Sequence, residues 1–161
     1  MRQRRTALIA ATYGMDVTLV YPEGYDLDPE LLSLAKKRCT EAGRKLELSH
    51  DLKTALEGAD AVFPSQWCTT RFCTNTREEE LRLTAQHKDW RLTESLLQLT
   101  NNAYFINSMP FDRGNDVDDS VADGPNSAVY DQAEDLLHVR KAVLTLLLAS
   151  KEDVEKYQRK A

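Results

Sequence analysis

The sequence predicts an α/β fold: a doubly wound, mostly parallel sheet of about four to five strands with helices on both faces. Short apolar, β-branched runs alternate with segments of helical periodicity along the whole chain. Turn residues, above all Gly and Pro, separate the two kinds of segment. The length of 161 residues suits one hydrophobic core. We therefore expect a single α/β domain over residues 1–161.

The first half of the chain predicts three strands separated by helices. The amino-terminal stretch favours a helix that ends at Gly14, because glycine adopts the left-handed backbone that closes many helices. A second helix is expected to begin at Asp28, with Pro29 in its first turn, and a third at Asp51. This alternation favours parallel strands with right-handed crossovers. The strands are expected at residues 16–21 (DVTLVY), 45–49 (KLELS) and 61–63 (AVF).

The second half predicts more helix and two further strands. Residues 78–90 are typical of a helix, and Thr93 is placed to cap the next one. A fourth strand is expected at residues 103–106, and residues 129–130 (Val-Tyr) would form a short fifth strand. The last helix is expected over residues 132–150. Its apolar stripe includes Ala133, Leu136, Leu137, Val139, Val143, Leu144 and Leu147.

The composition argues against several classes of protein. A formal net charge of −5 and a pI near 5.3 argue against nucleic acid as a partner, because phosphate binding needs a basic face. No apolar run approaches the roughly 20 residues of a membrane-spanning helix. The basic amino terminus is typical of a targeting peptide but shows no cleavage-like boundary, so we expect a plain domain helix there. We expect a cytoplasmic protein that binds no membrane.

The residues that commonly bind metals are not arranged as a metal site. The cysteines lack Cys-x-x-Cys pairing, which fits a reducing compartment without disulfide or zinc; they are Cys39, Cys68 and Cys73. The aspartates after the fourth strand lack EF-hand spacing and are expected to be solvated; they are Asp112, Asp116, Asp118, Asp119 and Asp123. The histidines are dispersed, and His138 is expected to pack within the last helix. The sequence predicts no metal and no cofactor.

The loop after the fourth strand is the first candidate for a binding site. It contains Asn107, Ser108 and Met109, directly beyond the apolar run. Ligands of open α/β sheets bind in the crevice outside the carboxyl ends of the strands. Residues 65–76 follow the third strand and form a second loop of the same kind. The position of these two loops predicts a binding site but does not identify its substrate.

Motifs in a fixed order connect the chain to a known family. They are Tyr13-Gly14-Met15-Asp16-Val17 through Pro22-Glu23-Gly24-Tyr25, Asn107-Ser108-Met109-Pro110, Arg113-Gly114-Asn115-Asp116-Val117, Asp123-Gly124-Pro125-Asn126-Ser127-Ala128-Val129, and Asp131-Gln132-Ala133-Glu134-Asp135-Leu136-Leu137-His138. Together they resemble the second, amino-acid-binding domain of the aspartate/ornithine carbamoyltransferase family. The similarity is greatest to the enzymes for ornithine or N-acylornithine.

The resemblance implies a Rossmann-like domain from arginine metabolism. In the family this domain binds the amine substrate, and the other domain and the cleft between them hold carbamoyl phosphate. The products are a ureido compound and phosphate. The family's phosphate motif, Ser-Thr-Arg-Thr, has no counterpart in this chain. We therefore expect one Asp/Orn-binding-like domain over residues 1–161 without a carbamoyl-phosphate domain. Its expected partner is another protein or further copies of itself, since the family forms trimers.

The resemblance also places the candidate site residues. Ser65 stands where ornithine enzymes have an Asp for the α-amino group, and a hydroxyl lacks that charge. An N-acylated ornithine would need no Asp there. Ser108 stands at the family's catalytic Cys position, and Leu136 at its carbamoyl-phosphate Arg; neither supplies the original chemistry. The expected substrate contacts are Ser65, Thr69, Thr70, Asn107, Ser108 and Met109.

Two hypotheses explain these residues. In the first, the chain is the amino-acid-binding domain of a divergent ornithine-type carbamoyltransferase, as a fragment or split-gene product that is inactive alone. In the second, it is a non-catalytic subunit that keeps the fold for interaction or regulation. A neighbouring Ser-Thr-Arg-Thr domain would favour the first, and a separate intact enzyme the second.

A further expectation concerns the sheet. The family's domain begins one strand earlier, and that strand is central in doubly wound sheets. We expect residues 16–21 and 103–106 to flank the place of this strand and to leave edges that recruit a partner.

Overall fold

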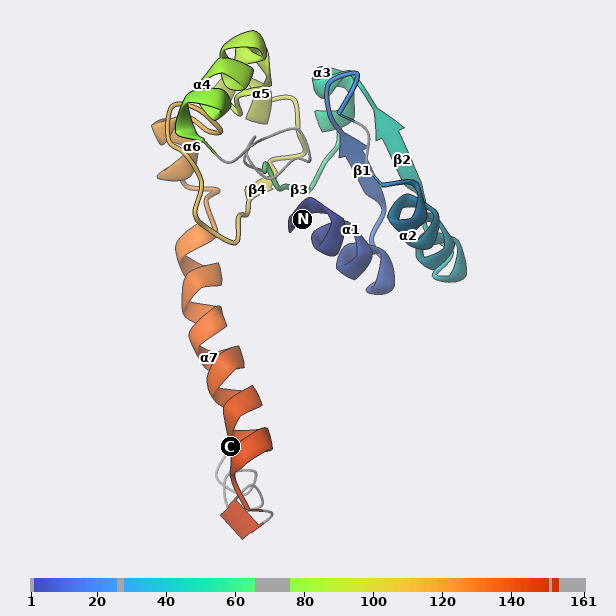
Figure 1. The fold of residues 1–161 in the computed structure, drawn as a ribbon, viewed down its shortest axis with the longest axis vertical. Coiled ribbons are helices and arrows are strands. Elements are labelled where there is room, and N and C mark those ends of the chain that lie inside the picture. Colours follow the sequence, from blue (N-terminus) through green and yellow to red (C-terminus); the bar gives the residue numbers. More distant parts are fainter. Residues whose placement is uncertain (1, 26–27, 66–75, 151, 154–161) are drawn as a thin grey trace.

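The structure, a computed structural model, describes residues 2–25, 28–65, 76–150 and 152–153. The chain folds into an α/β arrangement of short parallel strands and helices (Figure 1). The strands are β1 (Val17–Val20), β2 (Leu46–Ser49), β3 (Ala61–Val62) and β4 (Tyr104–Phe105). The helices are α1 (Arg2–Thr12), α2 (Pro29–Glu41), α3 (Leu52–Leu56), α4 (Arg77–Gln86), the 3₁₀ helix η2 (Lys88–Trp90), α5 (Glu94–Leu97), α6 (Asp119–Ala122) and α7 (Val129–Leu148).

The described strands form two parallel pairs. Strand β1 pairs with β2 from Val17 opposite Leu46 to Val20 opposite Ser49, and β3 pairs with β4. In Figure 1 the first pair lies with α1, α2 and α3, and the second lies with α4 to α7. The parallel α/β prediction is confirmed. Instead of one sheet of four to five strands, the described residues form two sheets of two strands.

The predicted fifth strand is wrong. Val129 and Tyr130 form the first turn of α7, and Val129 is fully buried. Sheet contact stops just before them: Phe105 donates from its amide to the carbonyl of Asn126, and Ala128 donates to the carbonyl of Phe105. The apolar pair at residues 129–130 therefore marks the buried start of a helix. A run of two residues carries no periodicity that would separate the two structures.

The expectation about the flanking strands also needs correction. Strand β4 is paired on both sides, with β3 on one and with Ser127 on the other. It therefore presents no open edge at Phe105. The break in strand pairing among the described residues lies between β1 and β3.

The helix ends follow the sequence signals. The carboxylates of Asp28 and Asp51 accept from the backbone amides two and three residues later, and Thr93 caps α5 in the same way through the amide of Leu96. Gly43 has a φ of +67°, and the amide of the next residue reaches back to the carbonyl of Cys39 at 2.7 Å. This is the Schellman arrangement that a glycine just past a helix end permits. The expected helix over residues 78–90 is divided at His87 into α4 and η2.

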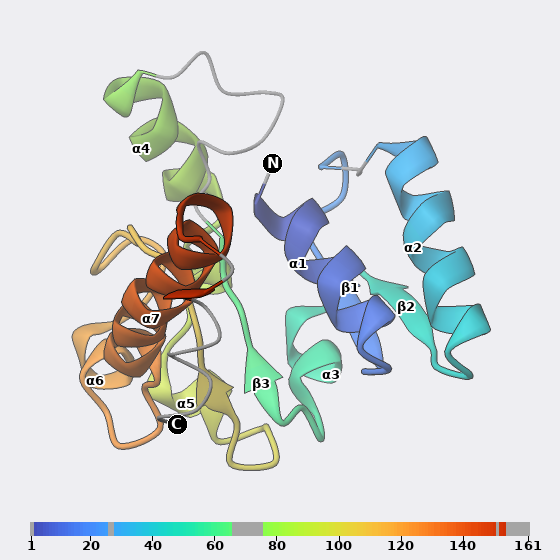
Figure 2. The same ribbon diagram turned by 90° about the horizontal axis from the view of Figure 1, so that it is seen from below.

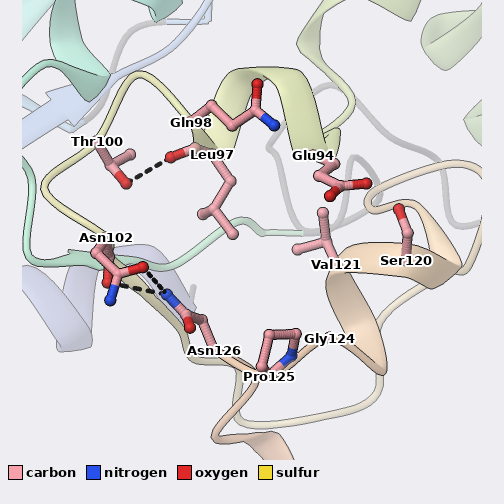
Figure 3. A pocket seen from close by; sticks show the side chains of 10 residues that line it. All are labelled: Glu94, Leu97, Gln98, Thr100, Asn102, Ser120, Val121, Gly124, Pro125 and Asn126. Carbon is pink, nitrogen blue, oxygen red and sulfur yellow. Dashed lines mark hydrogen bonds between the residues drawn. The ribbon is translucent and has the colours of Figure 1, made fainter.

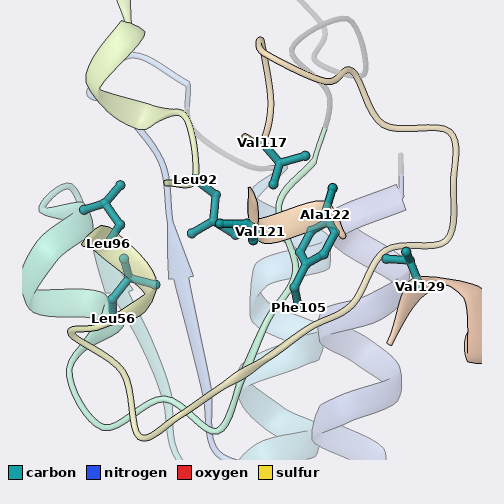
Figure 4. Close-up of a cluster of buried hydrophobic side chains, with 8 residues drawn as sticks. All are labelled: Leu56, Leu92, Leu96, Phe105, Val117, Val121, Ala122 and Val129. Carbon is teal, nitrogen blue, oxygen red and sulfur yellow. The ribbon is translucent and has the colours of Figure 1, made fainter. Parts of the chain in front are cut away.

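The main hydrophobic cluster lies around β3 and β4 (Figure 4). Phe105, Val117 and Val129 are completely buried in it, from a strand, a loop and a helix. The other pair of strands is covered by α1 and α2, which pack side by side in Figures 1 and 2. Those helices bury small side chains spaced four apart, which lie on one face of a helix. They are Ala7 and Ala11 on α1, and Ala35 and Cys39 on α2.

Helix α7 leaves this body after its first turn and extends along the long axis of the molecule (Figure 1). Of its residues only Val129 is buried. Within the described part of the chain, no helix combines the length and the apolar character that crossing a membrane requires.

Candidate functional site

Asn107 joins the loops that follow β3 and β4. It is 5% exposed and comes two residues after β4. Its Nδ2 donates to the carbonyl of Pro64 at 2.9 Å, and its Oδ1 accepts from the amide of Met109 at 2.8 Å. The first bond ties the two loops together, and the second fixes the turn at Ser108. Both loops leave the carboxyl ends of neighbouring parallel strands, the usual place for a ligand in this architecture.

Gln132, in the first turn of α7, holds the same junction from a third direction. Its Oε1 accepts from the backbone amide of Asn107 at 2.8 Å. Leu136 lies four residues further on and so shares the helix face of Gln132, one turn beyond the junction. Gln132 was not predicted as a site residue, although it belongs to the motif at residues 131–138. Gln132 and Asn107 are 25 positions apart in the sequence, so only the folded structure reveals the hydrogen bond between them.

Four of the predicted site residues lie along this junction. Ser65 directly follows Pro64, and Ser108 and Met109 directly follow Asn107. Ser108 is exposed at the loop surface, and Met109 is 40% exposed with a φ of +44°. Thr69 and Thr70 lie outside the described residues. The substrate contacts of Ser65, Ser108 and Met109 remain predictions, whereas the side chain of Asn107 is occupied by backbone partners.

Leu136 is 39% exposed on α7. Its side chain carries no hydrogen-bond donor, so it supplies no charge and no hydrogen bond to an anion at this position. That Leu136 replaces an Arg of the family is an expectation from the sequence resemblance. Its consequence for binding carbamoyl phosphate remains a prediction.

The motif at residues 113–117 is fastened to the motif at residues 123–129 by Arg113. Its guanidinium donates two bonds of 2.7 Å to the carboxylate of Asp123 and one of 2.8 Å to Asp119. It also lies 5.7 Å from the centroid of the Phe111 ring, within cation–π range. Arg113 lowers the pKa of the Asp123 carboxyl below its ordinary value, and the same bonds raise the pKa of Arg113. These motif residues hold the long loop in shape.

The expectation that the loop aspartates form a solvated surface is partly wrong. Asp116 is 4% exposed, and its Oδ2 accepts from the backbone amide of Asp112 at 2.8 Å. Asp118 pairs with Nε of Arg91 at 2.8 Å. The aspartates therefore satisfy donors within the fold, because a loop this long needs side-chain acceptors for its own backbone and for nearby arginines. No group of three or more His, Cys, Asp or Glu that could hold a metal occurs among the described residues.

His138 does not pack within the last helix as expected. Its side chain is exposed on α7, and its Nε2 lies 4.0 Å from the carboxylate of Glu134. The helix around it has no cover from the described body, so no packing partner is available. His138 stands apart from the junction at Asn107, which contacts the first turn of α7.

A shallow pocket of about 380 Å³ opens at the opposite end of β4 (Figure 3). Asn102 and Asn126 meet in its wall, where Nδ2 of Asn126 donates to the carbonyl and to the Oδ1 of Asn102. Gly124 also lines it, and no larger residue fits there, because a Cβ would lie 2.5 Å from the carbonyl oxygen of Ser120. These residues precede β4 or pack beside its start. The pocket is therefore separate from the loops at the carboxyl ends.

Comparison with known proteins agrees with this architecture. The family model for the Asp/Orn-binding domain of aspartate/ornithine carbamoyltransferases matches residues 3–147. The ornithine carbamoyltransferase of Halalkalibacterium halodurans is 38% identical over 141 residues, which cover 87% of this chain and 43% of that protein. The N-acetylornithine carbamoyltransferase of Xanthomonas campestris pv. campestris is 37% identical, with 87% and 41% covered.

Solved structures of similar proteins match the fold as well. A crystal structure of N-acetyl-L-ornithine transcarbamylase superposes with a TM-score of 0.80 at 35% identity, covering 91% of this chain and 44% of that one. An acetylornithine transcarbamylase complexed with acetylcitrulline also gives 0.80, at 34% identity, covering 92% and 44%. The chain thus spans less than half the length of these relatives. It belongs to the aspartate/ornithine carbamoyltransferase family, as its Asp/Orn-binding domain.

Proposed function

We propose that this chain is the amine-binding half of a divergent ornithine-type carbamoyltransferase. The observation that carries the proposal is the junction at Asn107, which ties together the loops beyond β3 and β4 and the start of α7. Three segments of the chain that meet at the carboxyl ends of parallel strands form the place where this fold class binds its ligands. Ser65, Ser108 and Met109 line this junction as the proposed substrate contacts, with Thr69 and Thr70 from the same loop as Ser65.

The substrate is an amine related to ornithine, with N-acylornithine favoured over ornithine. Ser65 offers a neutral hydroxyl where an α-ammonium group would gain from a carboxylate. An acylated nitrogen carries no charge, so it loses no ionic interaction when a hydroxyl stands in place of the carboxylate. Support comes from the similar solved structure that is complexed with acetylcitrulline.

The proposed reaction transfers a carbamoyl group from carbamoyl phosphate to the amine. The amine nitrogen attacks the carbonyl carbon, forming the new C–N bond. The C–O bond to phosphate breaks, phosphate leaves with the electron pair, and the nitrogen loses a proton. This chain would orient the amine through its loops. Binding the phosphate falls to another part of the assembly, because Ser108 provides no thiolate and Leu136 no donor for an anion.

The assembly that we propose also completes the sheet. A strand from outside residues 1–161 would lie between β1 and β3, where pairing is broken among the described residues. Thr18 and Val20 of β1 direct their backbone groups away from β2, because alternate residues of a strand pair with one neighbour. Each buried backbone group left unpaired would cost about 1 to 3 kcal/mol. A partner protein, or further copies of the chain in a trimer, would supply the missing parts.

The second candidate function is a non-catalytic subunit that binds a full-length carbamoyltransferase. The replacement of the family's Cys and Arg by Ser108 and Leu136 favours it, since both changes remove reactive or anion-binding groups. The fold and the Asn107 junction would be retained under either function. Carbamoyl transfer by the chain together with its partner would distinguish the two candidate functions.

The test is an assay for ureido product with carbamoyl phosphate and either ornithine or N-acetylornithine. The purified chain alone should form none. Co-expression with the part of the Halalkalibacterium halodurans enzyme that lies outside the match should restore product, with N-acetylornithine preferred. Product from the chain alone would contradict the proposed division of labour. An assembly that folds and binds the amine but forms no ureido product would support the non-catalytic function.

A further inference from the structure

We propose that the outer edge of β2 is a self-association surface, at which a second copy of this chain adds its own β2 in antiparallel orientation. The inference goes beyond the proposed function, because this surface is separate from the Asn107 junction. The surface, called the β2 edge, consists of residues 44–48, whose sequence is Arg-Lys-Leu-Glu-Leu.

The β2 edge is open in the described structure. Strand β2 pairs with β1 on one side, and no other described strand pairs with it. Figures 1 and 2 show β1 between β2 and the second pair of strands, so the free side of β2 points away from that pair. A groove of about 330 Å³ lies between the start of this edge and Lys36 and Thr40 of α2. Helix α2 therefore does not seal the start of the edge.

The backbone groups of Leu46 and Leu48 are directed at the open side. The carbonyls of Lys45 and Ser49 accept hydrogen bonds from amides on the β1 side. Alternate residues of a strand pair with the same neighbour, so the intervening Leu46 and Leu48 direct their amides and carbonyls away from β1. A row of such groups is a template for pairing with another strand.

Two-fold symmetry makes the added strand antiparallel. Dimers of identical chains are most often related by a two-fold axis, and an axis perpendicular to the sheet reverses the strand direction. Three registers bring the outward-facing backbone groups of the two copies together. They place Leu46 opposite Leu46, Leu46 opposite Leu48, or Leu48 opposite Leu48. The side chains of the residues between them decide among these registers.

Charge favours the register in which Leu46 lies opposite Leu46. Lys45 of each copy then lies opposite Glu47 of the other copy, twice in one dimer. These two residues form a pair without backbone hydrogen bonds between them, the kind whose side chains approach most closely. Placing Leu46 opposite Leu48 would set Glu47 against Glu47, and placing Leu48 opposite itself would set Glu47 against Ser49.

The two charged residues are available for this contact. Lys45 and Glu47 are exposed, and neither forms an ion pair within the described part of the chain. The neighbouring Arg44 has an acid of its own, because its Nη1 lies 3.7 Å from the carboxylate of Asp16. Charges commonly protect an edge strand, since like charges on two copies repel each other. On β2 the two signs are spaced so that an antiparallel copy is attracted.

The backbone contributes hydrogen bonds in the same register. Leu46 exchanges both of its bonds with Leu46 of the second copy. The amide of Leu48 meets the carbonyl of Arg44, whereas the amide of Arg44 is already bonded to the carbonyl of Cys39. The interface is short, and small interfaces are typical of weak association. We therefore expect a dimer whose population rises with protein concentration.

The test measures the mass of the full chain in solution by sedimentation over a range of concentrations. The original chain should form dimers. Lys45→Glu alone should weaken dimerisation by about tenfold or more, because it sets Glu against Glu twice. Glu47→Lys alone should do the same by setting Lys against Lys. The double variant Lys45→Glu/Glu47→Lys exchanges the two signs and should restore dimerisation.

Lys88→Glu on η2 is the matched control, an exposed substitution with the same change of charge, and it should leave dimerisation unchanged. Because Lys45, Glu47 and Lys88 are exposed, the thermal unfolding of the dilute variants should match that of the original chain. A monomer at every concentration would overturn the proposal. Equal effects of Lys45→Glu and Lys88→Glu would do so too, as would a double variant that associates no better than the single ones.

Hydrogen exchange gives an independent reading of the same contact. Exchange at the amides of Leu46 and Leu48 should slow as the concentration of the chain rises, because both amides become paired in the dimer. Exchange rates that do not change between dilute and dimeric samples would show that the copies associate through another surface.

Discussion

Asn107 is the residue on which the proposed site depends most. Its backbone amide donates to the side chain of Gln132, its Nδ2 donates to the carbonyl of Pro64, and its Oδ1 accepts from the amide of Met109. It shapes the site by holding two loops and a helix together. Its neighbour Ser108 is exposed at the loop surface, and its contact with a substrate remains a prediction.

Replacing the buried Asn107 by Ala should destabilise the chain by about 1 to 3 kcal/mol, because the part-buried carbonyl of Pro64 and amide of Met109 lose their partner. Asn101→Ala is a matched control, since Asn101 is exposed and makes one side-chain bond, to Asp60. Its cost should be about 1 kcal/mol or less. Urea unfolding of the two variants measures the difference. Equal losses would mean that the Asn107 junction adds no stability of its own.

Asp123 provides a pH-dependent test of the Arg113 network. Its folded pKa lies below that of the unfolded chain, about 3.9, so the pair stabilises the fold above that value and the contribution is lost as pH falls through the lower folded pKa. At pH 7 the Asp123→Asn variant should melt at a lower temperature than the original chain. The gap should close as the pH drops below about 4. A gap that stays constant across this range would show that the ion pair does not link Asp123 to stability.

For individual helices and strands, sequence signals that act within one helical turn predicted the structure better than patterns whose outcome depends on tertiary packing. Asp28, Asp51 and Thr93 cap their helices as expected, because a cap depends on residues within one turn. The prediction of a strand at residues 129–130 is wrong because the structure of this pair depends on the buried environment around Val129. The division of the sheet was not visible either, since periodicity carries no information about which strands pair.

The candidate site divides in the same way. Strand ends and loops place Ser65, Ser108 and Met109 at the carboxyl edge, as the α/β pattern predicted. The bonds from Asn107 to Pro64 and to Gln132 join residues 43 and 25 positions apart. Such contacts depend on the packing of whole elements, so the structural role of Asn107 could not be read from its neighbours in the sequence.

Strand β1 offers a direct test of the open edge between the two sheets. The amides of Val17 and Tyr21 donate to carbonyls on the β2 side, so those of Thr18 and Val20 face away from β2. In the chain alone, hydrogen exchange should be faster at Thr18 and Val20 than at Val17 and Tyr21. In a completed assembly all four should be protected. Equal protection in the chain alone would mean that this edge is already covered.

At the scale of the whole molecule, two surfaces without a described partner lie on different elements. The edge of β1 faces the break in the sheet, and the exposed apolar side chains of α7 from Leu136 to Leu148 have no cover from the described body. A single additional polypeptide that supplied one strand and one apolar surface would complete both. Under this account the chain is one part of a larger enzyme assembly, with the amine site at the Asn107 junction and the phosphate site elsewhere.

The measurement that tests this account most directly is chemical-shift mapping of the labelled chain with N-acetylornithine, with ornithine for comparison. The amides of Ser65, Asn107, Ser108 and Met109 should shift together on addition of the amine, and more strongly with the acylated compound. The pocket at the other end of β4 is the internal control, and the amides of Gln98 and Asn126 should stay in place. Shifts confined to that pocket, or shifts in neither place, would contradict an amine site at the junction.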